Sequence, residues 1–447
     1  MTLLDIFPSL RAAMAPRLDP ALWPVNTSHD DRGRIRVGGV ALDDIADQYG
    51  TPTYVLDEDD VRHRCRTYRS TLPKAEIAYA AKALMIRGVA SWVTHEGLSL
   101  DVCSSGELAI ALSAGVDPRR IILHGNAKTA SELRTAADAG VGRIVVDSHT
   151  EIRLLASVAP AHQKVLVRVT PGIDIHGHPA VTTGVDDQKF GFPITGGHAD
   201  AAIRLVLEQP NLELVGLHCH LGSQITDPHV FGTAVQRLIG QMDQVRRDHG
   251  LILTDLDLGG GHAVPYRPGD SQIDLTELAR TIEDALDGAC ARNRFPRPQL
   301  TLEPGRAIVA RAGVTLYRVV SVKTAPSGRI FAAVDGGMSD NPRVALYGAH
   351  YDVVVANRHP SGAHVPMTVV GRFCEAGDVL AGDVMLPADL HPGDVLAVPC
   401  TGAYHHSLAS SYNSVGRPPI VAVKDGNSRE LIRRESVADL LSRDVGL

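Results

Sequence analysis

The sequence lacks three features that mark large classes of protein. Its six cysteines are scattered without a C-x-x-C pair, which argues against a disulfide framework and against a zinc ribbon. Its formal charge of −7 leaves no basic surplus for binding nucleic acid or an anionic membrane. It contains no apolar run of about 18 residues, and its first residues do not have the basic-then-apolar design of a signal peptide. These absences predict a cytoplasmic protein whose partner is a small molecule.

The length of 447 residues predicts more than one domain, one of roughly 250 residues and one of roughly 130. Between residues 51 and 310, short apolar runs alternate with helical patterns, which is typical of parallel strands joined by crossover helices. The eight runs lie at 76–81, 98–103, 120–124, 143–147, 164–170, 212–218, 254–258 and 299–303. Eight such units predict an α/β fold, a parallel (β/α)8 barrel of the TIM type.

From residue 311 to residue 447 the pattern changes. Apolar, strand-like segments follow one another with turn residues between them and few helical stretches, which predicts a mostly antiparallel C-terminal β domain. Residues 1–50 form an N-terminal extension. Its strand-like segment at 34–42 is expected to join the β domain.

Several of the predicted barrel strands end in polar or glycine-rich segments, and such ends collect at one rim of a barrel. Lys82 follows the first strand among alanines, where lost hydration would free its amine for a Schiff base. A lysine at a strand end is also commonly an ordinary surface residue. Later strand ends supply groups suited to a phosphate: Gly222, Ser223, Gly259, Gly260, Gly261, Gly305 and Arg306. Together these ends favour a phosphorylated cofactor.

Glu303 ends the eighth strand and suggests which cofactor it is. If Lys82 holds pyridoxal phosphate, an acid on the eighth strand could keep the pyridine nitrogen protonated, and His220 could lie against the ring. A different interpretation is a metal site of an amidohydrolase-like barrel. His218 and His220, with the HGH sequence at 176–178 and either Glu303 or Asp101, would then be its ligands. That interpretation leaves Lys82 and the glycine-rich ends unexplained.

The order of motifs resembles diaminopimelate decarboxylase, of the alanine-racemase-like fold type of pyridoxal-phosphate enzymes. The motifs include the strand ends above and RVTPGIDIHGHP (168–179), TTGVDDQKFGF (182–192), VDGGMSDNPRVALYGAHY (334–351), FCEAGD (373–378) and GAYHHSLASSYN (402–413). The resemblance implies a barrel with a β domain, and a homodimer with shared active sites. It also implies decarboxylation of meso-2,6-diaminopimelate at its D-centre to L-lysine, the last step of lysine biosynthesis.

The resemblance also implies residue roles. Lys82 would form the Schiff base, His220 would stack on the ring, and Glu303 would hold the pyridine nitrogen. The phosphate would be held by Ser223, Gly259, Gly260, Gly261, Gly305 and Arg306, with Tyr404 approaching the cofactor from the β domain. Substrate would be bound by Arg306, Arg343, Tyr347, Glu375 and Tyr404. Cys374 would donate the proton, and Cys374 and Glu375 would come from the partner subunit.

The chain departs from the family pattern at seven positions: Ala127, His262, Ala263, Ala376, His405, His406 and Ser411. Several of these lie where the resemblance places the substrate. They keep open a paralogous decarboxylase of a related amino acid, in secondary metabolism or siderophore synthesis. A racemase is disfavoured by Glu303, because an arginine at the ring nitrogen is expected there. A silent homologue should have lost Lys82 or the glycine-rich loops.

Overall fold

The computed structural model describes residues 18–175, 184, 187–361 and 363–446, and the chain divides into two compact units. The barrel unit comprises residues 64–264 and 271–308. Of the described residues, those from 18 to 63, those from 265 to 270 and those from 309 onward belong to the β unit. Among the described residues, no helix is both long enough and apolar enough to cross a membrane.

The barrel unit contains the predicted ring of eight parallel strands. They are β5 (Glu76–Ala80), β6 (Ser99–Val102), β7 (Ile121–Leu123), β8 (Arg143–Val146), β9 (Gln163–Thr170), β11 (Leu212–His218), β12 (Asp255–Asp257) and β13 (Gln299–Leu302). The ring closes because β13 pairs with β5 and β8 pairs with β9, all in parallel register. A short strand, β10 (Phe192–Pro193), adds to β9 outside the ring. The expected barrel is therefore confirmed, and each predicted run overlaps one observed strand.

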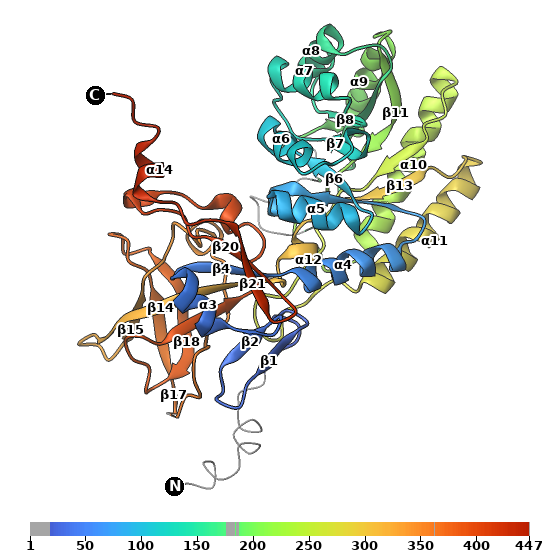
Figure 1. Cartoon of the computed structure of the whole chain (residues 1–447). Coiled ribbons are helices and arrows are strands. Elements are labelled where there is room, and N and C mark those ends of the chain that lie inside the picture. The colour runs from blue at the N-terminus through green and yellow to red at the C-terminus, as the bar shows by residue number, and fades with distance from the viewer. Residues whose placement is uncertain (1–17, 176–183, 185–186, 362, 447) are drawn as a thin grey trace. The chain divides into compact units, whose positions relative to one another are not determined.

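One helix precedes the first barrel strand and further helices follow the barrel strands, as the alternating pattern predicts (Figure 1). They are α4 (Glu58–Thr71), α5 (Arg87–His95), α6 (Ser105–Ser113), α7 (Ala130–Ala139), α8 (His149–Val158), α9 (His198–Leu207), α10 (His229–His249), α11 (Leu275–Asn293) and α12 (Arg306–Val309), with 3-10 turns η1 (Ala81–Ala83), η2 (Pro118–Arg120) and η4 (Thr195–Gly197). Their ends follow local chemistry. Thr129 and Glu132 form a reciprocal capping box at the start of α7, and Gly140 ends that helix in the left-handed conformation.

The β unit contains a mostly antiparallel sheet with the order β18-β17-β15-β14-β4-β20-β21. Its strands are β4 (Thr53–Asp57), β14 (Gly313–Thr324), β15 (Ile330–Val334), β16 (Val354–Val355), β17 (His364–Val370), β18 (Val379–Pro387), β19 (Val395–Pro399), β20 (Ile420–Lys424) and β21 (Asn427–Ile432). β19 pairs with β14 and with β16 beside this path. Short helical elements of this unit are α3 (Leu42–Tyr49), α13 (Arg343–Tyr347), α14 (Val437–Leu441), η5 (His406–Leu408) and η6 (Tyr412–Ser414).

Two N-terminal segments differ from expectation. β4 falls within the range 51–310 suggested for the barrel, but it pairs with β14 and β20 of the β unit. All five of its residues are buried, and a short buried strand has the same sequence character in either sheet. The segment at 34–42 does belong to the β unit, yet its strands β2 (Ile35–Val37) and β3 (Val40–Ala41) pair with each other and with β1 (Thr27–His29) in a separate sheet.

Candidate active site

The polar strand ends of the sequence meet at one rim of the barrel unit. Lys82 follows β5, Asp101 is the last residue but one of β6, His124 follows β7, and His218 ends β11. The glycine loop of residues 259–261 follows β12, and residues 303–306 follow β13. Because all eight strands are parallel, their C-terminal ends share this rim, and residues more than 200 positions apart in the chain become neighbours.

Lys82 lies in η1, directly after the buried strand β5, and is half-buried. Its charge affects the pKa of two carboxyl groups. Burial raises the pKa of Asp101, and the charge of Lys82 opposes that rise. Burial and Asp101 raise the pKa of Glu303, and Lys82 again opposes the rise. The lysine and both acids therefore form one electrostatic group at the rim.

The glycine-rich ends form a cradle in which backbones approach too closely for a side chain. A Cβ atom on Gly260 would lie 2.1 Å from the carbonyl oxygen of Glu303, and one on Gly261 would lie 2.1 Å from that of Gly222. Gly261 also has a φ of +95°, which side chains rarely adopt. Arg306 Nη2 donates to Ser223 Oγ at 3.1 Å, so a guanidinium and a hydroxyl meet in this loop cluster. A hydroxyl, a guanidinium and the backbone N–H groups of a glycine loop are donors that suit a phosphate. Two of these N–H groups already donate within the site, that of Gly259 to Asp257 and that of Gly260 to His220.

His220 is held against the glycine loop. Its Nδ1 atom accepts a hydrogen bond from the backbone N–H of Gly260 at 3.2 Å. Burial, and then the charge of Lys82, lowers the pKa of His220 well below its ordinary value, so the ring is neutral. A neutral, fixed imidazole beside the glycine cradle fits a residue that packs on an aromatic ring.

Glu303 is a buried acid that fits a cationic partner. It is 2% exposed, and its Oε2 atom lies 3.4 Å from Nε2 of His218. Its Oε1 atom accepts no hydrogen bond from an N–H group of the described residues, and the side chain that interacts with the Glu303 carboxyl beside His218 is another buried acid, Asp257. Burial and the neighbouring Asp101 raise the pKa of Glu303 to about 8. A protonated pyridine nitrogen would donate to Oε1 of Glu303 and favour the ionised carboxylate, so the site fits pyridoxal phosphate.

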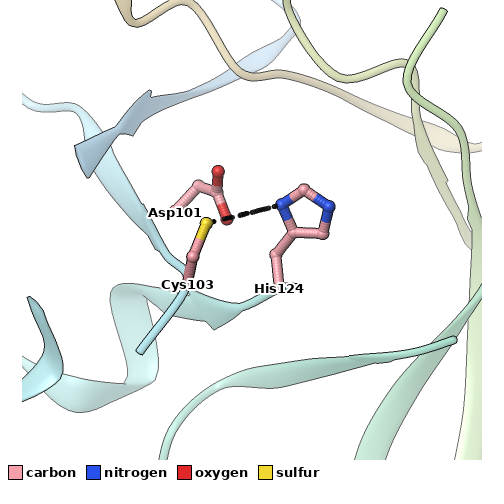
Figure 2. A group of neighbouring side chains, drawn as sticks. All are labelled: Asp101, Cys103 and His124. Atoms are coloured by element: carbon pink, nitrogen blue, oxygen red, sulfur yellow. Dashed lines mark hydrogen bonds and ion pairs between the residues drawn. The ribbon is translucent and has the colours of Figure 1, made fainter. Parts of the chain in front are cut away.

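Two side-chain groups at the rim have the composition of metal sites. Figure 2 shows Asp101, Cys103 and His124, whose potential ligand atoms lie within 4.8 Å of one another. His124 Nδ1 lies 3.5 Å from Asp101 Oδ1 and 3.9 Å from Cys103 Sγ. His124 also forms a second such group with His218 and Glu303. The second histidine motif predicted for a metal, HGH at 176–178, lies outside the described residues.

The hydrogen bonds of His124 do not fit a metal ligand. Arg168 Nη1 lies 2.9 Å from His124 Nε2, and a guanidinium can only donate, so Nε2 is the acceptor. The proton of the neutral ring is then on Nδ1, which leaves no free lone pair for a metal. Burial also raises the pKa of the Cys103 thiol well above its ordinary value, which disfavours the thiolate ligand. Neither of the two groups that contain His124 therefore fits a metal ion.

The sequence assigned no role to His124 or Arg168 in the site, and considered Asp101 only as a metal ligand. Arg168 is 2% exposed within β9, where it also lies 3.7 Å from Asp147 and stacks on the ring of Phe190 at 4.3 Å. The signal that could have identified it is a charged residue inside an otherwise apolar strand. His124 carried a similar signal, a histidine directly after the apolar run of β7.

The departure at His262 leaves the glycine loop intact. Its imidazole is 2% exposed, stacks on Tyr68 with centroids 5.6 Å apart, and forms a 2.8 Å hydrogen bond with the Tyr68 hydroxyl. Phe231 contacts the same ring edge-on at 5.3 Å. Burial lowers the pKa of His262 to about 4, so the side chain is a neutral core residue. The neighbouring Ala263 is also buried.

The remaining predicted site residues belong to the β unit. Arg343, the first residue of α13, is buried and donates to the phenol of Tyr351. Tyr347 ends the same helix and is 38% exposed. Tyr404 has a φ of +62°, an uncommon value for a residue with a side chain and one often found at functional sites.

Cys374 and Glu375 are exposed on the loop before β18. The phenol of Tyr412 donates to the carboxylate of Glu375, and the Tyr412 ring stacks on Phe373 with centroids 5.5 Å apart. Neither Cys374 nor Glu375 belongs to the barrel unit.

The departures in the β unit also have defined surroundings. His405 is buried, and His406 lies edge-on to Tyr54 at 6.0 Å. Ser411 Oγ donates to Glu435 at 3.1 Å. Ala376 is exposed on the same loop as Cys374.

Comparison with known proteins gives concordant results. The family described as the pyridoxal binding domain of pyridoxal-dependent decarboxylases matches residues 58–310. A diaminopimelate decarboxylase of Actinosynnema pretiosum subsp. auranticum is 54% identical over 445 residues, which cover 100% of both chains. That of Mycobacterium tuberculosis (strain ATCC 25618 / H37Rv) is 46% identical and covers 96% of this chain and 98% of its own. The crystal structure of diaminopimelate decarboxylase from M. jannaschii in complex with L-lysine has a TM-score of 0.89 at 30% identity, and covers 95% of this chain and 99% of that one.

Proposed function

Because the chain belongs to the diaminopimelate decarboxylase family of pyridoxal-dependent decarboxylases, we propose that it releases CO2 from the D-centre of meso-2,6-diaminopimelate and yields L-lysine. It is a carboxy-lyase whose cofactor is pyridoxal 5′-phosphate. This reaction would be the last step of lysine biosynthesis.

The proposed cofactor site uses residues of the barrel rim. Lys82 would bind the cofactor aldehyde through its amine. The phosphate would be held by Ser223, Arg306 and the backbone of Gly259, Gly260, Gly261 and Gly305, where close backbone contacts leave room only for glycine. His220 would lie against the ring, and Tyr404 would contact the cofactor from the β domain. Glu303 would hold the proton on the ring nitrogen.

When bound, pyridoxal phosphate supplies a ring that accepts the electron pair left by the departing carboxylate. The chain supplies the electrostatics for that chemistry. Glu303 has a buried oxygen that accepts no N–H hydrogen bond among the described residues and can keep the ring nitrogen protonated, and a neutral His220 adds no opposing charge beside it. The Lys82 amine lies in one electrostatic group with the buried carboxyls of Asp101 and Glu303, whose raised pKa values its charge opposes.

Arg343 supports the choice of a dicarboxylate substrate. Its buried guanidinium forms no ion pair with a carboxylate among the described residues, and a second carboxylate of the substrate would provide one. An amino acid without that carboxylate would leave a buried cation unpaired, so ornithine and arginine should be poor substrates. Arg306 and Tyr347 would assist Arg343, and Tyr404 would also contact the substrate.

Cys374 and Glu375 would complete the site from the partner subunit of a cytoplasmic homodimer. Both are exposed in the single chain, as residues that serve a neighbouring subunit must be. Cys374 would donate the proton that replaces the lost carboxylate, and Glu375 would bind the distal ammonium of the substrate.

The observation that carries the proposal is the state of Glu303. A buried acid for which His218 is the only ion-pair partner among the described residues, at the same rim as Lys82 and the glycine cradle, fits a cationic ring nitrogen. The experiment is CO2 release by the purified protein with pyridoxal phosphate. The meso, LL and DD isomers of diaminopimelate would be offered beside ornithine, arginine and lysine.

Release from the meso isomer alone, with lysine as product, is the expected result. Lys82→Ala should abolish release and the borohydride-trapped cofactor adduct, whereas Lys74→Ala removes an exposed lysine and should retain both. Release only from ornithine, arginine or lysine would overturn the proposed substrate and favour a paralogous decarboxylase. A borohydride-trapped cofactor adduct without CO2 release from any of these compounds would also overturn the proposed substrate and favour a paralogous decarboxylase.

A further inference from the structure

The guanidinium of Arg343 lies in an aromatic brace formed by Tyr266, Tyr351 and His405. Arg343 is 7% exposed, and its Nη1 atom donates to the Tyr351 hydroxyl. Its guanidinium carbon lies 4.8 Å from the ring centre of Tyr266 and 5.9 Å from that of Tyr351. These residues all belong to the β unit, so the brace is complete within one compact part of the chain.

The brace stabilises a charge that has lost most of its hydration. Burying a cation without a counter-ion is costly, and among the described residues no carboxylate forms an ion pair with Arg343. The face of Tyr266 and the phenol oxygen of Tyr351 offset part of that cost without neutralising the charge. The remaining N–H groups of the planar guanidinium bond no other described residue, and two of them can bind one carboxylate in parallel.

Tyr351 is itself fixed from two sides. It is 2% exposed, and its ring lies edge-on to Tyr266 at 5.3 Å and 83° and to His405 at 5.3 Å and 75°. His405 is fixed in turn, because its Nδ1–H donates to the carbonyl oxygen of Ala403 at 2.9 Å. The phenol that accepts the Arg343 hydrogen bond therefore has little freedom to move.

His405 is one of the positions at which this chain departs from the family pattern, and it directly follows Tyr404. An imidazole here gives Tyr351 a rigid neighbour, and it links the Arg343 brace to the strained backbone of Tyr404. The departure at His405 thus has a structural role, because its ring packs against Tyr351. It supports the arginine expected to bind the second carboxylate.

We propose that Tyr351, held by Tyr266 and His405, is a positioning residue that orients Arg343 for the second carboxylate of the substrate and so determines specificity for dicarboxylic amino acids. This inference rests on the proposed function. As a positioning residue, Tyr351 would not touch the substrate. It acts by limiting the orientations of the guanidinium before the substrate arrives.

The test is Tyr351→Phe, which removes the hydroxyl and keeps the ring. Loss of one hydrogen bond to a charged group should raise KM for meso-diaminopimelate roughly tenfold while kcat changes little. The equilibrium dissociation constant of the LL isomer, a dicarboxylate, should rise by a similar factor, and that of L-lysine, which lacks the second carboxylate, should not. In the Arg343→Ala background, Tyr351→Phe should have no further effect.

Tyr49→Phe is the matched control, because it removes a phenol bonded to Ser428 at 3.1 Å in the same unit and should leave KM unchanged. An unaltered KM and an unaltered dicarboxylate dissociation constant in Tyr351→Phe would overturn the inference, as would equal weakening of lysine. If the parent enzyme itself releases no CO2 from meso-diaminopimelate, the proposed function fails instead. The dissociation constants would still report on the brace.

Discussion

Glu303→Gln should make the cofactor-free protein less sensitive to alkaline pH and, at the same time, weaken the bound cofactor. The substitution keeps the size of the side chain and removes its ability to ionise. Burial and Asp101 raise the pKa of Glu303 from 4.5 to about 8, which corresponds to a cost of up to roughly 5 kcal/mol for ionising it in the empty barrel. That cost is absent in the glutamine variant.

The direction of the pH dependence follows from linkage. Because the pKa of Glu303 is higher in the folded than in the unfolded protein, its contribution to stability is fully present below its ordinary pKa of 4.5 and is lost as the pH rises through about 8. Relative to the parent, cofactor-free Glu303→Gln should therefore gain stability between pH 5 and pH 9. In a domain of this size, the difference in Tm should widen by several degrees over that range.

The assay is thermal unfolding of cofactor-free parent and variant at pH 5 and pH 9, followed by cofactor titration near pH 8. Cofactor affinity should fall by about 10- to 100-fold in Glu303→Gln, because a charge-assisted hydrogen bond to the ring nitrogen is lost. Glu213→Gln, at an exposed position of β11, should change neither quantity. A difference in Tm that stays constant from pH 5 to pH 9 would refute the buried, raised-pKa carboxyl. Unchanged cofactor affinity and turnover would refute its role at the ring nitrogen.

Three further predictions concern the barrel unit. Gly260→Ala should weaken cofactor binding at least tenfold in an absorbance titration, because its Cβ would lie 2.1 Å from the carbonyl oxygen of Glu303; Gly240→Ala on α10 meets nothing within 4 Å and should leave binding intact. Ala127→Asn should stabilise the protein by about 0.5–1 kcal/mol in denaturant unfolding, because the residue has a φ of +57° that asparagine tolerates better than alanine; an unchanged or lower midpoint would contradict this. Lys128→Met should destabilise the protein by about 3–5 kcal/mol in the same assay, because it leaves the buried carboxylate of Glu151, which lies 2.8 Å from the Lys128 amine, without a counter-ion. A loss of stability under about 1 kcal/mol would show that the ion pair is dispensable.

Much of the barrel was predictable because its signals are local. A strand needs a short apolar run, a crossover helix needs a 3.6-residue period and a cap, and both kinds of signal lie within about 15 consecutive residues. The eight strands therefore fall where the sequence places them, and Lys82 follows the first of them. The glycine loop at 259–261 was equally visible, because only glycine meets its backbone constraints.

The pairing of strands and the hydrogen bonds of the site could not be predicted in this way, because they join residues that are far apart in the chain. From its sequence, β4 could have joined either sheet, because the residues of a short buried strand do not indicate which strand it pairs with. The Arg168 bond to His124 fixes the ring proton of that histidine and removes it as a metal ligand, but the two residues are 44 positions apart. Their contact exists only because β7 and β9 belong to the same ring.

The alternation of strands and helices, the residue types at the strand ends and the glycine positions of the loop at 259–261 can all be predicted from local sequence. Tertiary structure decided the sheet to which β4 belongs, the tautomer of His124, and the placement of His262 in the core. It also decided the aromatic brace of Arg343, since Tyr266 lies 77 positions from the arginine that it faces. The physical reason is one of range. Backbone propensity and period depend on neighbours in the chain, whereas burial, proton position and charge stabilisation depend on neighbours in space.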